Sequence, residues 1–204
     1  FIAVDGDGEN TIIIAGGAND FTGADDIRKA APVLGNCQIA LCQFEVPLAA
    51  ILETVKIANR QEFPVVINPS PVNPTFPWDA VESDYVIVNE TEAEEILEFQ
   101  PTIENESIVR QRIHELRIAH LIVTRGSNGT LVFCKDGSAY DIDTLPVLPI
   151  DTVGAGDAFA GCFAARIALG ESVEDAVRAA NCAGALTTLG GGAQNPMPDY
   201  DKID

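Results

Sequence analysis

The sequence predicts an α/β fold of three layers, in which a mostly parallel β-sheet is flanked by helices. Short apolar, β-branched runs alternate with segments of helical periodicity along most of the 204 residues. Turns that contain Gly, Pro or Asn separate these segments. A glycine-containing loop around residue 154 leads from a proline-rich run straight into a helical pattern. This alternation is typical of parallel strands that are covered by helices on both faces.

Length and composition fit one globular domain with room for a small appendage. Hydrophobic residues make up 47% of the chain and charged residues 21%. The net charge of −19 disfavours nonspecific binding to nucleic acid and to anionic membrane surfaces. A polyanionic ligand would therefore need a local device, such as a helix N-terminus or a metal ion.

Neither a membrane span nor a zinc site is expected. No apolar run approaches the roughly 20 residues that a span needs, and no signal peptide is visible. The five cysteines are scattered through apolar segments without the spacing of zinc ligands. We expect free thiols in a reducing cytoplasm.

The first 18 residues form a unit of their own in this prediction. Apolar runs at 1–4 and 11–15 flank a glycine-containing segment, 5–10, and this pattern is typical of a β-hairpin. Residues 19–204 make up the α/β core.

Strands and helices then follow in turn through the core. Buried strands are expected at the apolar runs 37–42, 64–67, 85–88, 119–123, 130–134 and 138–142. Helices are expected at 25–34, 49–60, 89–99, 106–117 and 158–169, and after residue 172. Pro47 suits the first turn of a helix, and Ser172 suits an N-cap position.

The segment 151–161 carries the chemistry. Gly154 and Gly156 stand where the loop becomes a helix, and the first backbone N–H groups of a helix point outward without partners, ready for an anion. Asp157 adds a carboxylate within the same turn. An anion site beside a potential general base suits phosphoryl transfer. The alternative is that the glycines only shape a turn and Asp157 only caps the helix.

The string Asp-Thr-Val-Gly-Ala-Gly-Asp-Ala-Phe resembles the C-terminal signature of the ribokinase family of sugar kinases, also called the phosphofructokinase-B family. Further motifs resemble the same family: Gln-x-Glu-x-Pro from Gln43, Asn-Pro-x-Pro from Asn68, Asn-x-x-Glu from Asn89, Thr-x-Gly-x-x-Gly from Thr124 and Gly-Ala-Gln from Gly192. The match covers essentially the whole chain and is most like ribokinase. It implies a ribokinase-like fold in which residues 1–18 are part of a small β lid.

The resemblance implies an ATP-dependent sugar kinase, with ribose as the expected sugar. Asp157 would accept the proton of the sugar hydroxyl, and the amides of Gly154, Ala155, Gly156 and Asp157 would form the anion hole. Glu45 would contact the sugar, although its position could equally serve the N-terminus of the next helix.

The resemblance also assigns the nucleotide and the ions. The nucleotide would lie against Asn89, Thr124, Gly126, Gly129 and Asn181. The alternative for the Thr124 motif is an ordinary β-turn.

Glu92 would help to organise Mg²⁺ through water. Backbone carbonyls near Asp151 and Val153 would bind K⁺ in potassium-activated members of the family. Gly190 and Pro196 depart from the polar or charged residues that often occur there. A homodimer in the cytoplasm is expected.

The chain resembles the C-terminal two-thirds of a family member, without the N-terminal third that supplies most sugar-selecting residues. It is therefore expected to bind sugar weakly. Three alternatives stay open at this point: a non-catalytic ATP-binding fragment, a kinase for fructose, or a kinase for another sugar or a nucleoside. A Rossmann-type dehydrogenase is disfavoured, because the glycine turn comes late and no acidic residue ends a second strand about 20 positions on.

Overall fold

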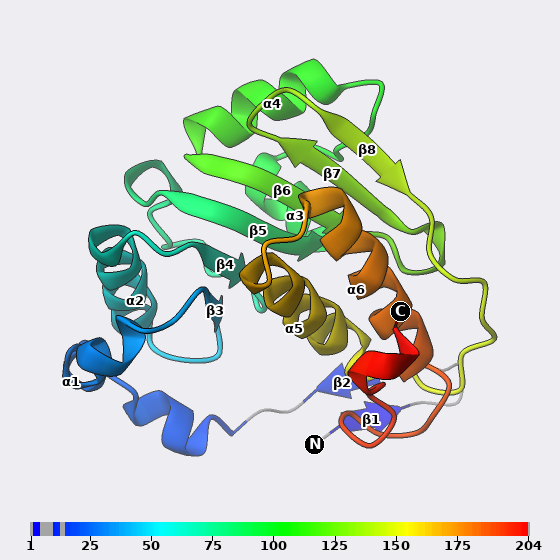
Figure 1. Ribbon diagram of the computed structural model, residues 1–204, viewed down its shortest axis with the longest axis horizontal. Helices are drawn as coiled ribbons and strands as arrows, with labels where there is room; N and C mark the ends of the chain where they lie inside the picture. Colours follow the sequence, from blue (N-terminus) through cyan, green and yellow to red (C-terminus); the bar gives the residue numbers. More distant parts are fainter. Residues whose placement is uncertain (1, 5–9, 13–14, 204) are drawn as a thin grey trace.

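A six-stranded β-sheet between two helical layers organises the core (Figure 1). The computed structural model describes residues 2–4, 10–12 and 15–203. The strand order is β3-β4-β5-β6-β7-β8. The bounds are β3 (Ala40–Gln43), β4 (Val65–Asn68), β5 (Ser83–Asn89), β6 (Ile118–Thr124), β7 (Thr130–Cys134) and β8 (Ala139–Ile142). Strands β3 to β6 are parallel, whereas β7 and β8 are antiparallel to their neighbours. The predicted three-layer, mostly parallel fold is confirmed.

Successive residues of the central strands face opposite helical layers, because side chains alternate across a strand. In β4, Val65 and Ile67 join the core beneath α2 (Leu48–Gln61), α3 (Glu90–Leu97) and α4 (Glu106–Glu115). Val66 instead joins the core beneath α5 (Ala155–Ala168) and α6 (Val173–Thr187). The near-continuous apolar runs of the sequence are the sign of strands buried on both faces.

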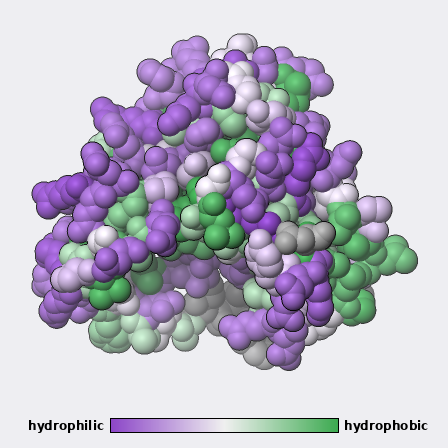
Figure 2. All heavy atoms as spheres, viewed as in Figure 1, coloured by the Kyte–Doolittle hydropathy of each residue, from purple (hydrophilic) through white to green (hydrophobic). Residues whose placement is uncertain are grey.

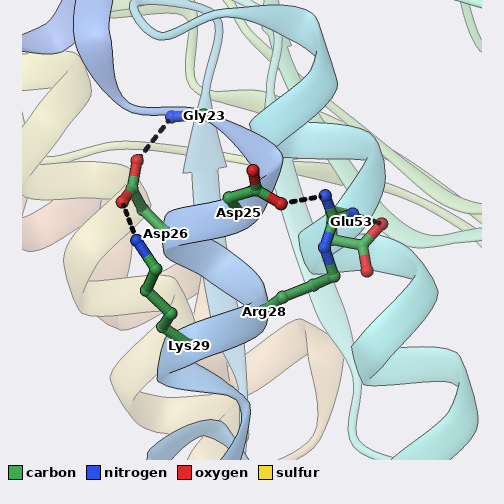
Figure 3. A network of polar contacts seen from close by, with 6 residues as sticks. All are labelled: Gly23, Asp25, Asp26, Arg28, Lys29 and Glu53. Carbon is green, nitrogen blue, oxygen red and sulfur yellow. Dashed lines mark hydrogen bonds and ion pairs between the residues drawn. The ribbon is translucent and has the colours of Figure 1, made fainter.

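Helix α1 (Ala24–Leu34) packs beside α2 and is tied to it by polar contacts (Figure 3). Arg28 contacts Asp25 on its own helix, and its Nη1 lies 3.2 Å from the Glu53 carboxylate on α2. Asp26 accepts the Gly23 N–H at 3.0 Å, which closes the start of α1. The side chains of Arg28, Asp25 and Asp26 are more than half exposed, so the ion pairs on α1 contribute little to stability.

Two short strands lie apart from the main sheet. Strands β1 (Ile2–Val4) and β2 (Asn10–Ile12) pair antiparallel, as expected for a hairpin. The predicted turn between them lies outside the described residues. Short 3-10 helices occur at Gly17–Phe21, Trp78–Ala80, Gly126–Asn128 and Tyr200–Lys202. All five cysteines are free, as predicted. Among the described residues no helix has the length and apolarity of a membrane span.

Two expectations about these elements were wrong. The strand expected at 37–42 as a buried element is β3, which begins at Ala40 and forms the edge of the sheet, with Leu41 40% exposed. An edge strand has a partner on one side only, and its sequence does not reveal this. The helix expected from residue 158 begins at Ala155, because Gly154 takes a left-handed conformation (φ 82°) as its N-cap.

Candidate active site

The carboxyl ends of the parallel strands bring polar side chains to one edge of the sheet. Gln43 on β3 lies opposite Asn68 on β4, and Asn89 on β5 lies opposite Thr124 on β6. Open α/β sheets bind ligands beyond this edge. The four motifs that begin at these residues are therefore gathered along one rim.

Helix α5 begins at the same rim. A Cβ atom on Gly154 would clash with the carbonyl oxygen of Ala193, so only glycine fits there. The Ala158 N–H donates to the Gly154 carbonyl at 2.9 Å, and the Ala155 N–H lies 3.3 Å from the Thr152 carbonyl. Among the described residues, the N–H groups of Gly156 and Asp157 have no recorded acceptor. Together with the N–H of Gly154, which also has no recorded acceptor among the described residues, these amides are the free donors at this helix N-terminus.

The space beside Gly156 is open, because a Cβ placed there would meet nothing within 4 Å. The next residue, Asp157, is exposed. Its Oδ1 accepts a hydrogen bond from Gln43 Nε2 at 2.9 Å, which connects α5 to the end of β3. Sequence reasoning gave Gln43 no role beyond its motif. The outward-facing carboxylate and the free amides are thus adjacent.

A cavity of about 470 Å³ runs from the β6–β7 connection to the start of α5. Its lining includes four of the five predicted nucleotide residues, Thr124, Gly126, Gly129 and Asn181. Ala155 and Gly156 from the predicted anion hole also line it. Asn89, the fifth nucleotide residue, is not among the lining residues. A cavity of this size suits a small-molecule ligand.

Buried hydrogen bonds fix the walls of this cavity. Asn181 accepts the Thr130 hydroxyl at 2.7 Å and donates to the Ile142 and Asp143 carbonyls at 3.3 and 3.2 Å. The oxygen and the NH₂ group of its side chain are therefore already hydrogen-bonded within the protein. A ligand in the cavity would contact the Asn181 side chain without replacing these bonds. Gly129 (φ 77°) lies so close to Ile142 that a Cβ would clash with the Ile142 carbonyl oxygen.

The loop between β8 and α5 forms an apolar rim of the cavity. Leu145, Pro146, Val147 and Pro149 line the cavity. Leu148 and Ile150 on the same loop are 89% and 75% exposed. Figure 2 shows a hydrophobic area at its right-hand edge. An apolar rim of this kind suits a flat apolar group of a ligand.

Asn89 and Glu92 form a capping box at the start of α3. Asn89 Oδ1 accepts the Glu92 N–H at 2.8 Å, and Glu92 Oε2 accepts the Asn89 N–H at 2.9 Å. Among the described residues no partner is recorded for Glu92 Oε1. One carboxylate oxygen thus serves the helix and the other is free.

Asp151 links two loops. Its Oδ1 accepts the Val153 N–H at 3.0 Å, and its Oδ2 accepts the Gly192 N–H at 2.9 Å. These bonds, the one from Gly192 first, lower the pKa of Asp151 below its usual value. In the described chain, no hydrogen bond is recorded to the backbone carbonyl oxygens of Asp151 and Val153. Those oxygens therefore remain available as ligands for a cation.

Glu45 follows Gln43 by two residues at the end of β3, and it is exposed. Together with Gln43 it borders a second hollow, of about 460 Å³, beside β3 and α2. The structure therefore places Glu45 near Gln43, at the same rim of the sheet as the α5 start.

Comparison with known proteins gives the family. The model of the pfkB family carbohydrate kinases matches residues 1–200. The chain is 32% identical over 209 residues to a ribokinase of Staphylococcus aureus (strain COL), covering all of this chain and 67% of that protein. It is 31% identical over 206 residues to a deoxyribokinase of Salmonella typhi, again covering 100% of this chain and 67% of the relative.

Solved structures agree with these relatives. The structure of Arabidopsis thaliana ribokinase complexed with ribose and ATP superposes with a TM-score of 0.85 at 28% identity, covering 99% of this chain and 66% of that one. Family match, relatives and fold lead to one conclusion: the chain belongs to the pfkB family of carbohydrate kinases.

Proposed function

We propose that this chain carries the nucleotide-binding and phosphoryl-transfer part of an ATP-dependent sugar kinase, with ribose as its sugar. One observation carries the proposal. A cavity of nucleotide-binding size ends at the start of α5, where the free amides of Gly156 and Asp157 lie beside the Asp157 carboxylate. The Arabidopsis ribokinase, which shares the fold, was solved with ribose and ATP, and this supports both ligands.

Each part of the α5 start has a task in this proposal. Asp157 accepts the proton of the sugar hydroxyl as that hydroxyl attacks the γ-phosphorus of ATP. The Gly156 and Asp157 amides, with the positive end of the helix dipole, stabilise the negative charge on the transferred phosphoryl group. Gly154 keeps the loop in the conformation that presents these amides.

Magnesium fits the Asn89–Glu92 corner as a water-held ion. Bound Mg²⁺ would neutralise charge on the ATP phosphates. Glu92 Oε1 is free to hold one of its waters. The described residues contain no group of three or more His, Cys, Asp or Glu side chains that could hold a metal. This suits an ion that takes most of its ligands from phosphate and water.

The free carbonyl oxygens of Asp151 and Val153 are the expected place for K⁺. Glu45 is the expected contact to a sugar hydroxyl, since a carboxylate accepts hydrogen bonds from hydroxyl groups. The proposal also includes a lid role for residues 1–18, a homodimer and a cytoplasmic location, all of which the family resemblance implies.

Titration with ATP beside a sugar-dependent ADP-release assay tests the proposal. ATP should bind, and ribose should release ADP faster than fructose or a nucleoside. Asp157→Asn should lower turnover about 1000-fold while ATP affinity stays within about twofold, because only the proton acceptor is lost. Near-normal turnover in that variant would remove Asp157 from the mechanism. Binding of ATP without ADP release for any sugar would indicate a non-catalytic nucleotide-binding protein.

A further inference from the structure

A chain of hydrogen bonds crosses three strands and ends at Asp157. Asn68 Nδ2 donates to the Ile87 carbonyl at 2.9 Å. Gln43 Nε2 lies 3.2 Å from Asn68 Oδ1 and donates to Asp157 Oδ1 at 2.9 Å. We call these two side chains, Gln43 and Asn68, the amide relay. It runs from the backbone of β5, through β4 and β3, to the first turn of α5.

The direction of every bond in the amide relay follows from its first acceptor. A backbone carbonyl can only accept, so Asn68 must turn its NH₂ group to Ile87 and its oxygen to Gln43. That oxygen can only accept, so Gln43 must present its NH₂ group. The same NH₂ group carries two hydrogens, and the second is available to the Asp157 carboxylate. The Ile87 carbonyl on β5 thereby determines that the NH₂ group of Gln43, and not its oxygen, faces Asp157.

The contact matters because Asp157 is otherwise unrestrained. It is exposed, and the structure records no other hydrogen bond to its carboxylate among the described residues. A general base must be held within hydrogen-bond distance of the proton that it receives. Gln43 fixes one oxygen with a neutral donor, adding no charge and leaving the other oxygen exposed.

We propose that Gln43 is a positioning residue for the general base, held by Asn68 so that Asp157 Oδ1 is fixed and Oδ2 receives the sugar proton. This inference rests on the proposed function of Asp157. The competing explanation is that Gln43 only packs β3 against α5. The two explanations predict opposite rankings of kcat for Gln43→Leu and Gln43→Glu. The reason is that glutamate has the shape of glutamine but cannot donate a hydrogen bond when ionised.

The experiment compares Gln43→Leu, Gln43→Glu and Asp157→Asn in the purified enzyme. Gln43→Leu should lower kcat about 10- to 100-fold with KM for ATP within about twofold, because Asp157 loses its orientation while the nucleotide cavity is unchanged. Gln43→Glu should lower kcat at least as much, since a second carboxylate repels the first. Gln43→Leu should add nothing further in an Asp157→Asn background.

Gln111→Glu is the matched control. Gln111 Nε2 donates to the Glu115 carboxylate at 3.0 Å on the surface of α4, so the variant breaks the same kind of bond away from the site. Its kcat should equal that of the unchanged enzyme. Thermal melting shows that each variant is folded before its rate is compared.

The outcomes separate the two levels of the argument. If Gln43→Glu turns over normally, or if Gln43→Leu lowers kcat equally in the Asp157→Asn background, the positioning role is overturned. If Asp157→Asn turns over normally, the proposed function fails, whatever the Gln43 variants do. An inactive Asp157→Asn beside two normal Gln43 variants removes the positioning role alone.

Discussion

The two sides of the site present different parts of the chain to a ligand. On the side that we propose for the nucleotide, which comprises the cavity from Thr124 to the start of α5, side chains such as Asn181 are bonded to the protein and backbone amides remain free. On the side that we propose for the sugar, around Glu45 at the end of β3, a side chain is exposed at the edge of the sheet. Rigid backbone donors suit a phosphate that every nucleotide shares, whereas side chains suit the choice of one sugar.

The sharpest test of the nucleotide side is Gly154→Ala. The variant would need a left-handed alanine whose Cβ clashes with the Ala193 carbonyl oxygen. We expect a loss of about 3 kcal/mol in the free energy of unfolding, together with weaker ATP binding. Chemical denaturation and ATP titration measure the two effects.

Gly156→Val is the matched variant two residues away. Its Cβ meets nothing within 4 Å, so stability should change by less than about 1 kcal/mol. The added side chain should nevertheless obstruct the phosphate and weaken ATP binding about tenfold or more. Unchanged ATP affinity in Gly156→Val would mean that the phosphate does not lie at the start of α5.

Asn181→Leu tests whether the cavity wall is held by buried hydrogen bonds. The variant leaves the fully buried Thr130 hydroxyl and the Ile142 carbonyl without their partner. We expect the free energy of unfolding to fall by about 2 kcal/mol. The exposed Asn59→Leu on α2 serves as a control and should change it little. Equal stability of the two variants would contradict the structural role of Asn181.

Glu45→Gln tests the sugar side alone. Because the carboxylate is a stronger acceptor than an amide, KM for ribose should rise about tenfold, which corresponds to about 1.4 kcal/mol. ATP affinity should not change, since Glu45 does not line the nucleotide cavity. Glu95→Gln, an exposed position on α3, controls for the loss of one negative charge. An equal rise in KM for ribose and KM for ATP would contradict the separation of a sugar side from a nucleotide side.

The smallest expected effect concerns Asp151 and pH. Its folded pKa is below the usual 3.8, so the unfolded chain takes up the proton first as pH falls. The contribution of this carboxylate is fully present above about pH 3.8 and is lost as pH falls through the lower folded value. Melting temperatures of the protein and of Asp151→Asn should differ by a constant amount from pH 7 to 5 and converge below pH 3.8. A constant difference at every pH would contradict this.

The sequence predicted the elements well wherever local signals decide the conformation. Ser172 caps α6, as its residue type indicated, and its Oγ accepts the Asp175 N–H at 3.1 Å. The runs of apolar residues located the inner strands β4 to β7, since burial on both faces leaves a clear pattern. The motifs at the ends of parallel strands converge because the topology brings all such ends to one edge.

The sequence could not predict which elements lie opposite one another in the fold. Gln43 and Asp157 are separated by 114 positions, and periodicity reveals which face of an element is buried without naming its neighbour. The same limit applies to the exposed edge at β3 and to the hydrogen bonds of Asn181. The family motif contains Gln43, but only the packing of α5 against β3 indicates a task for it.

The bond from Gly192 to Asp151 can form during protein synthesis only after the intervening residues have been translated. The loop at 154–156 leaves the ribosome before Gly192, because Gly192 lies 41 positions after Asp151, to which it is bonded. A nascent chain that stops short of Gly192 has the glycines and Asp157 but lacks the contact that pins their loop. The loop that we propose for phosphate binding therefore gains this contact only after Gly192 has been translated.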